Sequence, residues 1–90
     1  MVRMFIRHQV SDYTKWRQVY DAFADGQQRL GVRADAVYQA PHHANDITVT
    51  RDFDTIEAAR AFLARDELRS TVAQAGVANE PTIWFAEERE

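Results

Sequence analysis

Apolar and polar side chains alternate with a period of two along several stretches of the chain. This alternation predicts four strands, over residues 3–10, 32–39, 47–53 and 82–87. Successive side chains of a strand point to opposite faces of its sheet. The first strand therefore places Met4, Ile6 and His8 on one face, and Phe5 and Arg7 on the other.

Helical spacing replaces the alternation in the segment after the first strand. Residues 12–25 are predicted to form a helix that begins at Ser11 or Asp12, whose side chains can accept the free N–H groups of a first turn. The apolar face of this helix is mostly aromatic and consists of Tyr13, Trp16, Val19, Tyr20 and Phe23. We expect Gly26 and Gly31 to end this region, with fraying over residues 27–30.

A second helical pattern follows the third strand. Asp54 and Glu57 resemble a capping box, so Asp54 is the expected N-cap. The apolar positions then recur at helical spacing at Ile56, Ala59, Phe62 and Leu63. A short further helix is expected to begin at Asp66 and to stop at Gly76.

Pro41 through Asn45 read as a turn, which makes the second and third strands an antiparallel hairpin. The resulting order, β-α-β-β-α-β, is that of a ferredoxin-like α+β domain. Its four-stranded antiparallel sheet carries the helices on one face. A chain of 90 residues has room for one such domain, spanning residues 1–90.

The face of the sheet without helices needs a cover. Phe5 lies there between Arg3 and Arg7, and the last strand adds either Trp84 or the pair Ile83 and Phe85. A mixed aromatic and charged patch suits a self-complementary interface, and a short chain has only a thin core of its own. We therefore predict a homodimer through this sheet face.

Charge and composition exclude several classes of protein. The net charge of −3 and the scattered arginines argue against binding to nucleic acid or to an anionic membrane. The absence of cysteine excludes disulfides and thiolate chemistry. No segment resembles a signal peptide or a membrane span, so a cytoplasmic location is expected. His42 and His43 are adjacent and would point apart in an extended segment, so no metal site is expected.

Several motifs resemble a known family. Arg7-His8-Gln9-Val10, followed by Asp12-Tyr13 and Trp16-Arg17, is similar to the opening of small bacterial dimeric α/β-barrel proteins. The resemblance extends over almost the whole chain through Asn45, the segment Asp66-Glu67-Leu68-Arg69, and Ala75-Gly76-Val77 before Pro81. The hairpin departs from the family, since it reads His42-His43-Ala44-Asn45 where many relatives have Asp-Pro-Asn.

These proteins are similar to the antibiotic-biosynthesis monooxygenases and polyketide cyclases. The resemblance implies a dimeric α/β barrel with a ligand pocket between the sheet and the helices of each subunit. It also implies no cofactor, neither flavin, metal nor haem, because an electron-rich aromatic substrate reacts with oxygen directly.

The residues that could carry chemistry lie near the end of the first strand. His8 could act as a general base near neutral pH, or be a structural histidine tied to a carbonyl or carboxylate. The aromatic residues of the first helix could be plain core, or could line a pocket for a flat ligand. Besides the catalytic candidate His8, the predicted ligand-binding residues are Arg7, Tyr13, Trp16, Tyr20 and Asn45.

Two functions are consistent with this pattern. The first is a cofactor-independent monooxygenase or cyclase that acts on a small aromatic or polyketide-like compound. The second is a non-catalytic dimeric module that binds a small ligand, or a stress-responsive protein of the same superfamily. Both rest on one fold, and a fold by itself does not determine a function.

Overall fold

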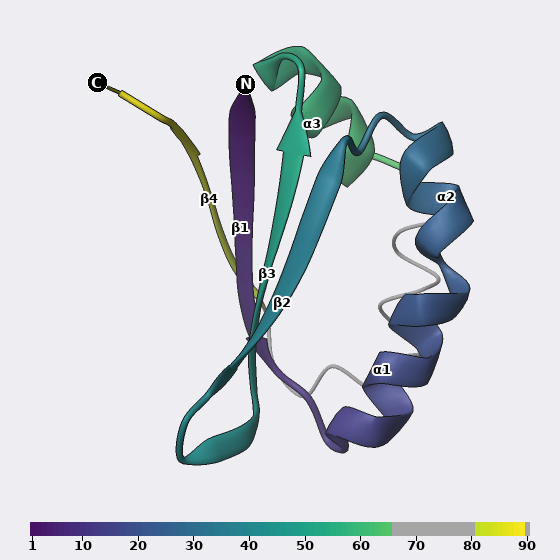
Figure 1. Cartoon of the computed structure of the whole chain (residues 1–90), viewed down its shortest axis with the longest axis vertical. Helices are drawn as coiled ribbons and strands as arrows, with labels where there is room; N and C mark the ends of the chain where they lie inside the picture. Colours follow the sequence, from purple (N-terminus) through teal and green to yellow (C-terminus); the bar gives the residue numbers. More distant parts are fainter. Residues whose placement is uncertain (66–80, 90) are drawn as a thin grey trace.

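A four-stranded antiparallel sheet with helices on one face makes up the protein, as the sequence predicted. The computed structural model describes residues 1–65 and 81–89. The sheet has the order β2-β3-β1-β4 (Figure 1). Its strands are β1 (Val2–Gln9), β2 (Ala34–Ala40), β3 (His43–Phe53) and β4 (Thr82–Glu87). The helices are α1 (Tyr13–Ala22), α2 (Ala24–Arg29) and α3 (Ile56–Leu63). This is the ferredoxin-like α+β class.

The core lies between the sheet and the helices and has two clusters of buried side chains. The first cluster packs α3 against β1 and β3 through Met4, Ile6, Val32, Phe53, Ala59 and Phe62. The second packs α1 against the other end of β3 through Val10, Trp16, Tyr20, Ile47 and Val49. The aromatic face of α1 thus belongs to the second cluster.

The single helix expected over residues 12–25 is two helices. Asp12 caps α1 as predicted, because its carboxylate accepts the N–H groups of Thr14 and Lys15. The chain then bends at Phe23, whose backbone leaves the helical region, and α2 continues to Arg29 instead of fraying. Gly26 does not stop a helix. It lies inside α2, where an added Cβ would come within 2.7 Å of the Phe23 ring.

Two other local predictions were wrong in detail. The turn between β2 and β3 is shorter than expected, because β3 already begins at His43. The N-cap of α3 is Thr55, whose hydroxyl accepts the N–H of Ala58. Asp54 instead accepts two hydrogen bonds from the guanidinium of Arg33. The predicted helix from Asp66 to Gly76 lies outside the described residues.

The face of the sheet away from the helices, here called the outer face, carries an aromatic pair. Phe5 and Trp84 are direct neighbours on β1 and β4, and their rings stack with centroids 5.1 Å apart and planes 1° apart. Trp84, and not Ile83 or Phe85, is therefore the large apolar side chain that β4 contributes to this face. The side chain remains 42% exposed in the monomer.

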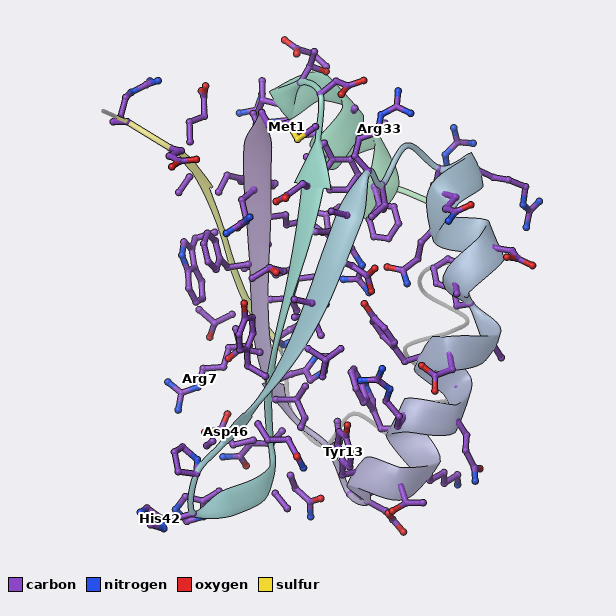
Figure 2. All side chains as sticks on the ribbon, viewed as in Figure 1. Met1, Arg7, Tyr13, Arg33, His42 and Asp46 are labelled. Carbon is purple, nitrogen blue, oxygen red and sulfur yellow. The ribbon has the colours of Figure 1, made fainter. Side chains whose placement is uncertain are left out.

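Two ion pairs flank the aromatic pair on the outer face. Arg3 donates two hydrogen bonds to Asp52, at 2.7 and 3.1 Å, and Arg7 does the same to Asp46, at 3.1 and 2.7 Å. Figure 2 shows Arg7 and Asp46 on the side of the sheet opposite to the helices. These hydrogen bonds lower the pKa of both aspartates, so all four side chains are charged at neutral pH.

Candidate functional site

His8 lies on the helix-facing side of β1, in line with Met4 and Ile6. Its side chain is only 8% exposed, and its Nε2 atom is buried without a hydrogen-bond partner among the described residues. The imidazole meets the ring of Trp16 edge-on, with centroids 5.7 Å apart and an interplanar angle of 71°. Buried polar atoms nearly always have a partner, so a ring nitrogen with none among residues 1–65 and 81–89 is unusual for a purely structural histidine.

The protonation state of His8 follows from these surroundings. Burial lowers the pKa of His8 below its ordinary value of 6.5, and the positive charge of Arg51 lowers it further. The imidazole is therefore neutral at pH 7. A neutral imidazole whose Nε2 is bonded to none of the described residues can take up a proton from a ligand.

Three aromatic side chains of α1 form a continuous stack beside His8, here called the aromatic wall. They lie on one face of the helix because they are spaced three and four residues apart. The ring of Trp16 stacks on Tyr13 at 6.0 Å and on Tyr20 at 5.0 Å, with interplanar angles of 29° and 26°. The wall is predominantly core, since Trp16 and Tyr20 are 3% and 7% exposed. Trp16, the middle ring of the wall, nevertheless contacts the imidazole of His8.

Tyr20 ends the wall with a polar contact. Its hydroxyl donates a hydrogen bond to Asp35 on β2. Burial, together with this hydrogen bond, raises the pKa of Tyr20 to about 12. The phenol is therefore protonated throughout the physiological range and acts as a hydrogen-bond donor.

Arg51 and Gln27 are two buried polar residues that the sequence analysis did not single out. Arg51 is 6% exposed, and its Nε donates a hydrogen bond of 2.5 Å to the side-chain oxygen of Gln27. A signal for Arg51 was present, because it alternates with Val49 and Phe53 and must share their core-facing side. Gln27 lay in a segment expected to fray, so nothing marked it.

Asn45 ties the hairpin to the start of α1. Its side-chain oxygen accepts the N–H of Tyr13 at 3.0 Å, and its amide nitrogen donates to the carbonyl of Ser11 at 3.4 Å. The backbone carbonyl of Asn45 also accepts the N–H of Val10 at 2.9 Å. Asn45 therefore holds the segment that joins His8 to the aromatic wall.

Not all predicted site residues come together. His8, Tyr13, Trp16 and Tyr20 form one group, and Asn45 braces it. Arg7 lies on the opposite face of the sheet in its ion pair with Asp46 (Figure 2). Neighbouring residues of a strand must point to opposite faces, so Arg7 and His8 cannot share a site within one subunit.

Residues 1–65 and 81–89 contain neither a membrane-spanning helix nor a cluster of metal-ligating side chains. None of their helices is both long enough and apolar enough to cross a bilayer. These residues also bring no three histidine or carboxylate side chains together in a way that could hold a metal ion.

The fold and the position of His8 define a ferredoxin-like α+β protein with a buried imidazole under its helices. No family model and no curated protein matches the chain in sequence. Solved structures do match it in fold: two of them are assigned to the antibiotic biosynthesis monooxygenases, and a third is a cofactor-independent oxygenase.

One match is a protein from Bordetella bronchiseptica assigned to the antibiotic biosynthesis monooxygenases. It has a TM-score of 0.87 and 10% identity, over 99% of this chain and 97% of that one. A second is SnoaB from Streptomyces nogalater, a cofactor-independent oxygenase, with a TM-score of 0.83 and 15% identity over 99% and 93% of the two chains. A third, from Deinococcus radiodurans, has the same assignment as the first, with a TM-score of 0.79 and 18% identity over 100% and 94%. At these identities the likeness establishes a shared fold.

Proposed function

We propose that the protein is a cofactor-independent oxygenase of a small, electron-rich aromatic compound, with His8 as its general base. The observation that carries the proposal is the buried, neutral imidazole whose Nε2 has no partner among the described residues and which contacts Trp16. The fold shared with SnoaB, itself a cofactor-independent oxygenase, supports the same reaction class.

His8 would start the reaction by removing a proton from the substrate. In the tautomer that carries its hydrogen on Nδ1, the Nε2 atom presents a lone pair for this step. An anthrone serves as an example. Loss of a proton from its CH₂ group gives a carbanion that is electron-rich enough to reduce oxygen. One oxygen atom becomes the new carbonyl, the other leaves as water, and the substrate supplies all four electrons.

The aromatic wall would position the substrate. A fused-ring compound would stack against this largely buried wall, at about 0.5–1.5 kcal/mol for each ring pair. Asn45 would hold the wall at a constant distance from His8 through its bonds to Ser11 and Tyr13. Its replacement would act on the geometry of the site and not on the proton transfer itself.

The proposal is tested by oxygen consumption of the wild-type protein with a panel of anthrones and hydroquinones. Metal chelator is present and no flavin is added. We expect consumption above the uncatalysed rate, with one oxygen molecule used for each quinone formed from an anthrone. Binding of these compounds without oxygen consumption would replace the oxygenase with a non-catalytic ligand-binding module.

We also propose that the outer face is the surface through which two copies associate. Its centre is the stacked pair of Phe5 and Trp84, and its rim carries the ion pairs of Arg3 and Arg7. An apolar centre with a polar rim is the usual composition of a protein interface, and tryptophan often contributes most to its affinity. A hollow of about 680 Å³ beside Arg3 and Phe5 could receive side chains of the partner.

Replacing Trp84 with aspartate should separate the dimer. Loss of an interface tryptophan weakens association by at least about 30-fold, which is 2 kcal/mol or more, and a buried charge adds to this. Light scattering after size-exclusion chromatography, over a range of micromolar concentrations, measures the change. Gln18→Asp on the exposed side of α1 is the matched control and should remain dimeric. A wild-type protein that is monomeric at these concentrations would contradict the interface.

A further inference from the structure

Arg51 is a buried cation at the junction of the two core clusters. Its guanidinium carbon lies 5.5 Å from the centre of the Tyr20 ring, in one cluster, and 5.1 Å from that of Phe62, in the other. Burying a charge is costly unless opposite charge and hydrogen bonds compensate it. An apolar residue of similar size would fill the same space at lower cost, so packing does not explain an arginine here.

No carboxylate among the described residues compensates the charge of Arg51 by direct contact. Within residues 1–65 and 81–89, Arg51 takes part in no ion pair, whereas Arg3, Arg7 and Arg33 each pair with an aspartate. Its Nε is bonded to the neutral amide of Gln27. The negative charge of Asp35 is close enough to raise the pKa of Arg51, but the Asp35 carboxylate accepts its hydrogen bond from the hydroxyl of Tyr20.

The aromatic wall connects Arg51 to His8. The ring of Trp16 is 5.7 Å from His8 and 5.0 Å from Tyr20, and Tyr20 in turn is 5.5 Å from the guanidinium of Arg51. On the sheet, His8 pairs with Ile47, four residues before Arg51 on β3, which is about 13 Å along the strand. His8 and Arg51 therefore lie at two ends of the aromatic wall.

We propose that Arg51 is the anion-binding residue of this site, and that its ligand is a planar fused-ring aromatic acid. The acidic group, in its simplest form a carboxylate, meets the guanidinium, and the reactive end of the ring system lies at His8. This proposal rests on the proposed function for the position of the ligand. The planar guanidinium fork matches two carboxylate oxygens, and its hydrogen bonds are strengthened by charge and by exclusion of water.

Calorimetric titration with anthracene-2-carboxylate and with its uncharged carboxamide tests the proposal. The wild-type protein should bind the carboxylate at least about ten-fold more tightly than the carboxamide. Arg51→Met keeps the volume of the side chain without its charge, and should bind the two probes with equal affinity. Arg51→Lys should retain part of the preference. Arg33→Met is the matched control, because Arg33 is exposed and paired with Asp54, and should keep the full preference.

A wild-type protein without preference for the carboxylate, or an Arg51→Met variant that keeps the preference, would overturn the proposal. If Arg51→Met does not fold, the side-chain Nε–H signal of Arg51 in the NMR spectrum of the wild type decides the question. The signal should shift on addition of the carboxylate and not of the carboxamide. An unmoved signal rejects the site.

The outcome is independent of turnover. A carboxylate preference that depends on Arg51, together with no oxygen consumption, would reject the oxygenase and retain the anion site. Oxygen consumption that depends on His8, without any preference for the carboxylate, would retain the oxygenase and reject the anion site.

Discussion

Replacing His8 with glutamine should lower the rate of oxygen consumption by roughly 100- to 10,000-fold, which is the usual contribution of a general base. Glutamine has similar size and can hydrogen-bond, but it cannot take up a proton. The aromatic wall contacts His8 only at Trp16, so binding of the substrate should change little. The loss should therefore appear in kcat, and the KM should stay within a few-fold of wild type.

The pH profile gives the same experiment a second readout. Burial, and then the charge of Arg51, lowers the pKa of His8 below 6.5, so the rate of the wild type should fall with a midpoint below pH 6.5 as the pH is lowered. Tyr20, with its pKa of about 12, does not titrate in this range. Protonation of His8 favours the unfolded chain, so the stability that its neutral form contributes above pH 6.5 is lost as the pH falls through the folded pKa.

His42→Gln is the matched control for the loss of an imidazole. His42 is exposed at the tip of the hairpin, and Figure 2 shows it apart from Tyr13 of the aromatic wall. This variant should keep the wild-type rate and pH profile. If His8→Gln retains the wild-type rate, His8 is not the general base, and the buried imidazole no longer supports an oxygenase.

Replacing Phe62 with alanine should have the largest effect on stability. The side chain is fully buried, and its ring packs against Phe53 at 5.5 Å and against Phe23 at 6.5 Å. Truncation of a buried phenylalanine costs about 3–5 kcal/mol through lost burial and the cavity that remains. The change also removes the ring that covers the guanidinium of Arg51.

Such a loss is a large part of the roughly 5–15 kcal/mol that stabilises a typical domain. Urea denaturation at fixed protein concentration should show a midpoint lower by at least roughly 1 M. Arg60→Ala, on the exposed side of the same helix, should change the free energy of unfolding by no more than about 0.5 kcal/mol. A similar midpoint for the two variants would mean that α3 does not depend on this contact.

The period-two pattern determined much of the sheet without reference to the structure. The last strand was predicted over residues 82–87 and is observed there. The division of β1 into a side with His8 and a side with Arg7 was likewise correct. Alternation is reliable because strand geometry points neighbouring side chains to opposite faces, whatever surrounds them.

Boundaries and caps depended on contacts between distant parts of the chain. Asp54 has the residue type and the spacing of an N-cap, yet it pairs with Arg33, and Thr55 caps the helix instead. Local propensity contains no information about such partners.

The candidate site shows the same division. The sequence by itself determined that His8 faces the core and that an aromatic stripe runs along the first helix. Only the tertiary structure decided that His8 contacts Trp16, that Arg51 lies against Tyr20, and that Trp84 is the aromatic residue that joins Phe5 on the outer face. The physical reason is that strand and helix periods specify directions within one element. Distances between side chains on different elements arise only when the elements pack.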